Sequence, residues 1–188
     1  MNIPAGTLAH RAFTIAEMER MAEVGVIGPD ERLELLSGEL VPMSPKGSRH
    51  EAIKAALALH WGSICPKGYA FATETGLRLD ERTYLEPDFV VFQRTVRLAD
   101  LKGSDVLLAV EVADSSLSYD LERKPAIYAA FGVRELWVID VAGRVIHRHA
   151  DPRAGGYADI EQSSAADALI PLYAPVAFAF MLDGLEPI

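Results

Sequence analysis

The 188-residue sequence lacks the features that mark secreted and membrane proteins. Its single cysteine, Cys65, excludes an internal disulfide, so we expect a reducing cytoplasm and a packing role for this side chain. The first residues carry neither a basic leader nor an apolar run, which argues against a signal peptide. The most apolar late stretch, residues 169–182, is too short to span a bilayer and contains two prolines. The composition predicts a soluble globular protein that has no membrane partner.

Motifs of nucleotide-binding and serine-hydrolase folds are missing as well. The sequence has no G-x-x-x-x-G-K-[ST] or G-x-G-x-x-G run, and Ser115 and Ser116 do not stand in a G-x-S-x-G elbow. Positive charge is also scarce, with 18 Lys and Arg against 27 Asp and Glu and a net charge of −9. This balance is unfavourable for a nucleic-acid binder, because phosphate contacts draw on a surplus of Lys and Arg. Carboxylates gathered around a metal ion account for part of the negative excess.

Hydrophobic periodicity predicts two helices and a hairpin in the first third of the chain. Residues 13–26 have apolar side chains at helical spacing. Two short apolar runs within residues 33–42 flank Ser37 and Gly38, a pair typical of a hairpin turn. Residues 48–64 form the most regular helical pattern.

The middle of the chain alternates between strands and helices. Strands are predicted at 73–79, 88–92, 107–113, 135–141 and 145–150, and a helix at 118–131. The strand, helix and strand within residues 107–141 form a βαβ unit, so its two strands are expected to be parallel. We expect one domain over 1–188, with a helix and hairpin in 1–46, a core in 47–150 and a packing segment in 151–188.

Glu111 is out of place in its surroundings. It lies inside LLAVEVA, a run apolar enough to be covered on both faces. An ionised carboxylate there costs several kcal/mol unless it is paired or binds a cation. The residue therefore indicates either a structural salt bridge or a metal ligand.

Asp88 and Lys124 add to this pattern. Asp88 begins the apolar strand FVVF, where an aspartate is also a common turn residue. Two carboxylates at the ends of adjacent strands offer the oxygen ligands that Mg²⁺ or Mn²⁺ prefers. Lys124 falls within the apolar stripe of its helix and can point along the sheet, although an i, i+4 pair with Asp120 is an alternative role. Pro125 disfavours helical geometry at Lys124, so the helix must begin or kink there.

The order of these segments resembles the Uma2 (DUF820) family of the PD-(D/E)XK phosphodiesterase superfamily. The resemblance covers most of the chain and rests on short motifs in a fixed order: LELLSGELVPMSP (33–45), His50, EPDFVVF (86–92), LLAVEVADSS (107–116), YDLERKPAIYAAFGV (119–133) and ELWVID (135–140). It implies an α/β fold of the restriction-endonuclease-like class, in which helices flank a mixed central sheet.

The resemblance also implies a metal-dependent DNA endonuclease. Asp88 and Glu111 are expected to hold Mg²⁺ or Mn²⁺ together with the Val112 carbonyl. Lys124 stands in for the lysine that the standard pattern places two residues after the glutamate, where this chain has Ala113. The family usually has an ordinary helix former at the position of Pro125, and this departure leaves activity open.

Other polar residues belong to the resemblance without an assigned role. Glu39 is a candidate outer ligand carried by the hairpin, Glu34 is expected to be exposed, and Asp120 is expected to support Lys124. Outside it, His147 and His149 share one face of a predicted solvated edge strand. A second cluster (Lys46, Arg49 and Lys54) is expected to form an ordinary solvated face.

Two main functions remain open at the level of sequence, and metal-dependent hydrolysis of some other phosphoester is a third alternative. The first is a DNA endonuclease that acts as a homodimer, since cutting both strands commonly uses two active sites. The second is a catalytically silent nuclease fold that serves as a binding or assembly module. The acidic balance and Pro125 favour the second, and the grouping of Asp88, Glu111 and Lys124 favours the first.

Overall fold

The computed structural model describes residues 11–185, which form two compact units. The first unit takes in the chain up to Met43 together with Arg78–Leu85. The second consists of Ser44–Leu77 and the chain from Glu86 onward. Asp88, Glu111 and Lys124 all belong to the second unit.

The first unit consists of one helix and a small antiparallel sheet. Helix α1 (Ile15–Glu23) begins with the Thr14–Glu17 capping box. The sheet has the order β2-β1-β5-β4. Its strands are β1 (Leu33–Leu36), β2 (Glu39–Pro42), β4 (Leu77–Asp80) and β5 (Thr83–Leu85). Ser37 and Gly38 both have positive φ at the β1–β2 turn, which explains why the tight hairpin requires this dipeptide.

A six-stranded mixed sheet forms the centre of the second unit, in the order β10-β9-β8-β7-β6-β3. Strand β7 is parallel to β8, and the other neighbouring strands are antiparallel. The strands are β3 (Tyr69–Thr73), β6 (Phe89–Gln93), β7 (Val106–Ala113), β8 (Glu135–Asp140), β9 (Val145–Arg153) and β10 (Gly156–Ser164).

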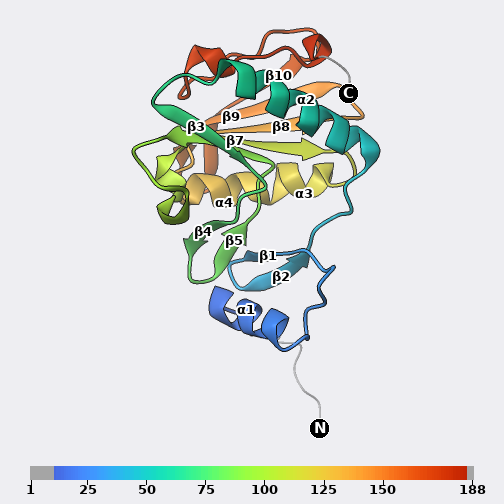
Figure 1. Ribbon diagram of the computed structural model, residues 1–188, viewed down its shortest axis with the longest axis vertical. Coiled ribbons are helices and arrows are strands. Elements are labelled where there is room, and N and C mark those ends of the chain that lie inside the picture. Colours follow the sequence, from blue (N-terminus) through green and yellow to red (C-terminus); the bar gives the residue numbers. More distant parts are fainter. Residues whose placement is uncertain (1–10, 186–188) are drawn as a thin grey trace. The chain divides into compact units, whose positions relative to one another are not determined.

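Helices cover both faces of this sheet (Figure 1). Helix α2 (Ser48–Ile64) lies on one face, and α3 (Leu117–Glu122) and α4 (Lys124–Ala130) lie on the other. Along β7, Val110 and Val112 pack in the core on the α2 side. Because side chains alternate along a strand, Glu111 points to the opposite side, toward α4.

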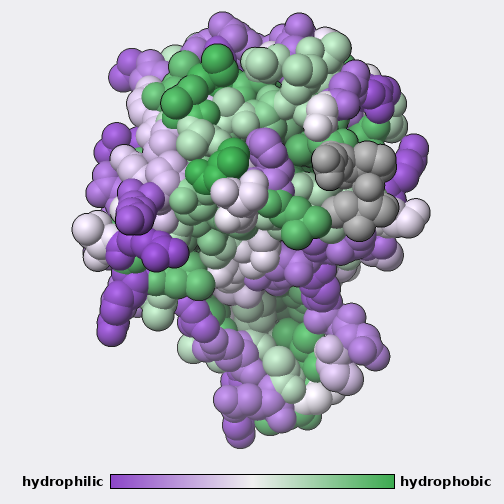
Figure 2. All heavy atoms as spheres, turned by 45° about the horizontal axis from the view of Figure 1, so that its top comes forward, coloured by the Kyte–Doolittle hydropathy of each residue, from purple (hydrophilic) through white to green (hydrophobic). Residues whose placement is uncertain are grey.

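The C-terminal segment completes the core on the α2 side. Short 3₁₀ turns occur at Val176–Phe178 and Leu182–Gly184, as they also do earlier at Leu98–Asp100 and Gly103–Asp105. The Trp61 indole donates a 3.0 Å hydrogen bond to the Phe178 carbonyl. The segment also leaves apolar side chains exposed, among them Leu172 and Val176. Figure 2, with the top of Figure 1 turned forward, shows apolar patches (green) interspersed with polar side chains.

The fold confirms most of the elements expected from the sequence. The helix over 48–64, the buried strand near 107–113 and its parallel pairing with the strand after the crossover are all present. The prediction of a single strand over 73–79 is wrong, since β3 ends at Thr73 and β4 starts at Leu77. The helix expected over 118–131 is divided at Arg123. In the described part of the chain, no helix is long and apolar enough to cross a membrane.

Candidate active site

Asp88 lies at the start of β6, where its carboxylate is held by three groups. Oδ2 accepts a 2.8 Å hydrogen bond from the Val112 amide. Oδ1 lies 3.1 Å from His50 Nε2 and 3.7 Å from Lys46 Nζ. His50, at the start of α2, also donates through Nδ1 to the Val112 carbonyl at 2.7 Å. One histidine thus bridges two of the oxygens that the sequence suggested as metal ligands.

This environment favours an ionised Asp88. Burial raises the pKa of the carboxyl group, but the hydrogen bond and charge of His50 oppose it. The Val112 amide and the Lys46 ammonium add to that opposition, and the net pKa lies below the ordinary value of 3.8. Asp88 is therefore a charged oxygen donor in a nearly buried position.

Glu111 and Lys124 form a buried pair on the other side of β7. Lys124 Nζ lies 3.0 Å from Glu111 Oε1 and 3.2 Å from Asp120 Oδ1. The Tyr128 hydroxyl donates to the same Glu111 oxygen at 2.6 Å. The Lys124 ammonium also stands 5.3 Å from the centre of the Tyr119 ring. Three side chains from α3 and α4 therefore contact the lysine or the glutamate and help to fix their positions.

The strand register brings Asp88 and Glu111 to neighbouring positions. Phe89 pairs with Val110 in the antiparallel β6–β7 ladder, so Asp88 and Glu111 lie one step further along it, on adjacent strands. The bond from Asp88 to the Val112 amide ties the first carboxylate to the residue that follows the second. The structure thus brings together the end of β7 and the start of β6, as the sequence predicted.

The oxygen atoms of Asp88, Glu111 and Val112 are of the kind that a hard divalent cation takes as ligands. Among residues 11–185, no three His, Cys, Asp or Glu side chains form a metal-binding cluster. A site here would therefore combine the Asp88 and Glu111 carboxylates with the Val112 backbone oxygen, and oxygen ligands of this kind suit Mg²⁺ and Mn²⁺. The remaining ligands of a six-coordinate ion would be water or substrate oxygens.

Two lysines expected on a solvated face lie instead beside the site. Lys46 forms an ion pair with Glu74 and reaches toward Asp88, and Lys54 bonds both Glu74 and Glu51 at 2.8 Å. Their side chains are only 15% and 12% exposed, so the expectation of a solvated face is wrong for both. It holds for Arg49, which is 66% exposed and pairs with Asp114.

Other expectations also change once the fold is known. Glu34, expected to be exposed, is buried, whereas Glu39 is exposed; both belong to the first unit. The role of Glu39 as an outer ligand stays a prediction. The strand that carries His147 and His149 is not an edge strand, because β9 lies between β8 and β10. His149 is buried as a result.

The sequence did not identify Tyr128, Glu74 and Lys46 as neighbours of the site. A signal for Tyr128 existed, since it stands four residues after Lys124 on the same helical stripe. Its hydroxyl could have indicated a contact with Glu111, because a tyrosine buried beside a carboxylate normally donates a hydrogen bond to it. Glu74 and Lys46 lie outside regular elements and meet only through the tertiary fold.

Comparison with known proteins gives one family match. A family model described as "Uma2: Putative restriction endonuclease" matches residues 15–182. A search of curated proteins found no match.

Two of the solved structures that match the chain differ in the extent of their fold similarity to it. A DUF820 protein from Anabaena variabilis ATCC 29413, described as a putative nuclease, matches with a TM-score of 0.65 and 16% sequence identity. The match covers 81% of this chain and 88% of that protein, and it shows that the two share a restriction-endonuclease-like fold. The type IIG restriction endonuclease BpuSI matches with a TM-score of 0.35 and 16% identity, over 57% of this chain and 13% of that enzyme. Similarity at that level carries no argument.

Proposed function

Because the chain belongs to the Uma2 family, we propose that it is a metal-dependent endonuclease that hydrolyses phosphodiester bonds in DNA. The observation that carries the proposal is that Asp88 and Glu111 stand at neighbouring positions on adjacent strands and that Glu111 is paired with the buried Lys124. These three residues are buried and charged, and they lie among groups that fix their orientation. Such a cluster is costly to fold and is typical of a catalytic centre.

The three residues divide the chemistry between them. Asp88 and Glu111 would hold the divalent ion with the Val112 carbonyl, and the ion supplies Lewis-acid activation of water and neutralises charge on the scissile phosphate. Lys124 holds an ammonium group beside Glu111, where it would stabilise negative charge that develops on the phosphate oxygens. Asp120, Tyr119 and Tyr128 keep that ammonium and Glu111 in place.

The second candidate function is that of a catalytically silent binding module. One observation favours it: Asp88 and Glu111 each already accept hydrogen bonds or ion pairs from protein groups. His50 and Lys46 face Asp88, and Lys124 and Tyr128 face Glu111. A silent binding module would keep these contacts and take up no ion. Calorimetry with Mn²⁺ separates the two functions, because the proposed nuclease must bind the ion and the silent module need not.

The test of the nuclease function uses three substitutions, in each of which the new side chain is similar in shape to the one that it replaces. Asp88→Asn, Glu111→Gln and Lys124→Met are each expected to reduce nicking of supercoiled DNA in Mg²⁺ or Mn²⁺ by at least about 100-fold, because each removes a charge at the reacting phosphate. Glu161→Gln is the matched control, since Glu161 is an exposed carboxylate paired with Arg148 on the distant β9–β10 hairpin. Thermal melting of each variant verifies that it is folded.

The possible outcomes are distinct. If all three variants cut like the parent protein, the assignment of these residues is wrong. If the parent protein cuts no DNA in either metal, the proposed function itself is wrong.

A further inference from the structure

A hollow of about 340 Å³ lies beside α3, within the second unit. Its walls are made of hydroxyl groups, one aromatic ring and one residue of each charge. The lining residues are Ser44, Ser115, Ser116, Ser118, Tyr119, Glu122 and Arg123. None of them belongs to the catalytic trio proposed above.

Two walls of the hollow touch the groups that hold Lys124. The Ser116 hydroxyl donates to Asp120, whose other oxygen is paired with Lys124. The Tyr119 ring packs under the Lys124 ammonium. A molecule bound in the hollow is therefore separated from the catalytic lysine by a single layer of side chains.

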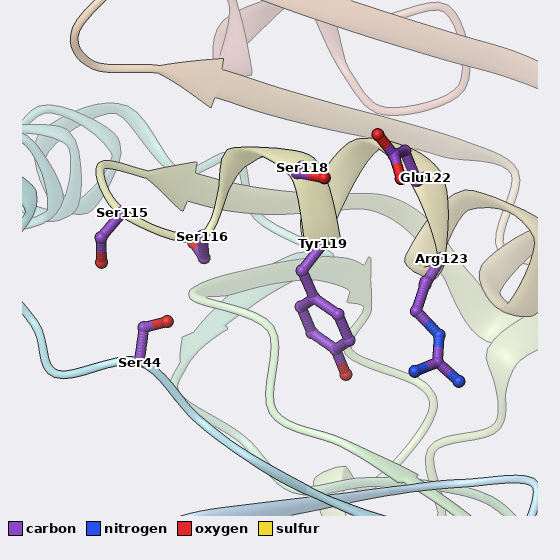
Figure 3. Close-up of a pocket in the computed structure, with 7 residues that line it drawn as sticks. All are labelled: Ser44, Ser115, Ser116, Ser118, Tyr119, Glu122 and Arg123. Carbon is purple, nitrogen blue, oxygen red and sulfur yellow. The ribbon is translucent and has the colours of Figure 1, made fainter.

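Six of the seven side chains that line the hollow carry a hydrogen-bond donor, and Glu122 is the one carboxylate among them. Figure 3 shows Ser115, Tyr119 and Arg123 extending to the same side of α3, toward the segment that carries Ser44. Glu122 points to the opposite side of the helix. Arg123 is exposed and its guanidinium can bind two oxygens at once, a geometry suited to phosphate esters. Serine hydroxyls are common partners of phosphate oxygens in nucleic-acid complexes.

We propose that this hollow binds a phosphate group of the DNA strand next to the bond that is cut. This proposal rests on the proposed function, because it assumes a nucleic-acid substrate at the same site. A chain with net charge −9 has no surplus of cations to spread over a binding face. It can hold a strand only where local donors converge, and the hollow provides such a place next to Lys124.

The test measures DNA binding and its salt dependence for Arg123→Gln. A fluorescent 20-base-pair duplex is titrated in Ca²⁺, which also takes oxygen ligands, and cleavage in Mn²⁺ is scored separately. Loss of one charge-assisted contact is expected to weaken binding about tenfold. The slope of log K against log of the salt concentration should fall in magnitude by about 1.

Arg153→Gln is the matched control, since Arg153 is an exposed arginine at the end of the sheet away from the hollow. It should leave affinity and slope unchanged. Ser115→Asp is a second variant that places a negative charge in the hollow, and it should weaken binding more than Arg123→Gln does. Melting curves verify that the variants are folded.

Each outcome decides between the two proposals. If the parent cuts DNA but Arg123→Gln binds like the parent, the hollow is not a strand site and the nuclease function stands. If binding depends on Arg123 but no metal supports cutting, the strand site stands and the nuclease function falls. Equal losses in Arg123→Gln and Arg153→Gln overturn the strand site. So does binding of inorganic phosphate as tight as that of the duplex, which makes the hollow a free-phosphate site.

Discussion

The contacts of the Glu111 carboxylate are compatible with two roles, a structural salt bridge and a catalytic centre. Its pairing with Lys124 is the contact that a purely structural salt bridge would make, and also the contact that a catalytic centre would make before metal binding. Burial alone does not separate the two, because a buried carboxylate needs a partner in either case. Under the proposed function, Asp88 is the second carboxylate of the site, because it stands next to Glu111 on the adjacent strand.

His149 is buried without the partners that a polar side chain normally needs. It is 6% exposed, and within the described residues neither ring nitrogen has a hydrogen-bond partner. Burial, assisted by the nearby His147, lowers its pKa from 6.5 to about 4. In the folded protein this ring therefore stays neutral at a pH where it is charged in the unfolded chain.

This burial predicts a loss of stability in mild acid. Between pH 6.5 and 4 the unfolded chain binds the extra proton, so the free energy of unfolding falls as the pH falls. The expected loss between pH 7 and pH 5 is about 2 kcal/mol from this residue. Urea unfolding at both values should show it, and His149→Phe should remove most of the pH dependence. An unchanged slope in the variant would assign the acid sensitivity to other groups.

At the scale of elements, the division between α3 and α4 decides where Lys124 points. Arg123 ends α3 and caps α4, and Pro125 stands in the first turn of α4, where its missing amide hydrogen breaks no helical bond. The proline therefore starts a helix rather than kinking one, and Lys124 becomes the first residue of α4. The departure from the family pattern therefore costs α4 no backbone hydrogen bond.

Replacing this proline should affect stability more than activity. Pro125→Ala is expected to lower the free energy of unfolding by about 0.4–1 kcal/mol, because the unfolded chain gains freedom. Denaturant titration measures that loss, and DNA nicking in Mn²⁺ should remain within twofold of the parent. If the alanine variant instead cuts far faster or slower, the proline controls the position of Lys124 and the view of it as a helix start is wrong.

The sequence predicted the elements whose pattern is local and regular. Helix α2 and strand β7 have continuous apolar periodicity, and the crossover between β7 and β8 follows from chain handedness. Strand β10 was missed because its residues, GYADIEQSS, are polar and follow a glycine pair that suggests a loop. It is a strand because its backbone pairs with β9 over the length of the hairpin.

For the candidate site, as for the fold, the sequence identified only what shows in a local pattern. Asp88, Glu111 and Lys124 could be selected because each breaks the polarity pattern of its own element. The contacts that hold them could not be predicted, since His50 reaches the site from α2, Tyr128 from α4 and Lys46 from the segment before α2. Their positions depend on the packing of α2 and α4 on opposite faces of the sheet, which no local pattern encodes.

At the scale of the whole molecule, the excess of acidic groups favours binding of a divalent cation. The net charge of −9 includes two carboxylates held in nearly buried positions at the β6–β7 junction. A cation that binds the folded protein and not the unfolded chain raises the apparent stability by mass action.

Manganese should therefore stabilise the protein against heat. At about 100 times its dissociation constant, Mn²⁺ is expected to add about 2.7 kcal/mol, which raises Tm by roughly 5–10 °C for a chain of this size. Scanning fluorimetry measures the shift, EDTA should reverse it, and Asp88→Asn should abolish it. An equal shift in Asp88→Asn would place the bound ion elsewhere on the molecule.

The packing of residues 169–182 has a consequence for how the protein folds during its synthesis. Trp61 belongs to a core cluster that includes Leu169, Phe178, Phe180 and Leu182 of this segment. The buried carboxylate of Glu135 accepts hydrogen bonds from the backbone amides of Leu172 and Tyr173. While a ribosome is still adding this segment, the nascent sheet has its α2 side open to water. Cooperative folding of the second unit then waits until residues 169–182 have left the ribosome, and until then chaperones can cover the exposed apolar face around Trp61.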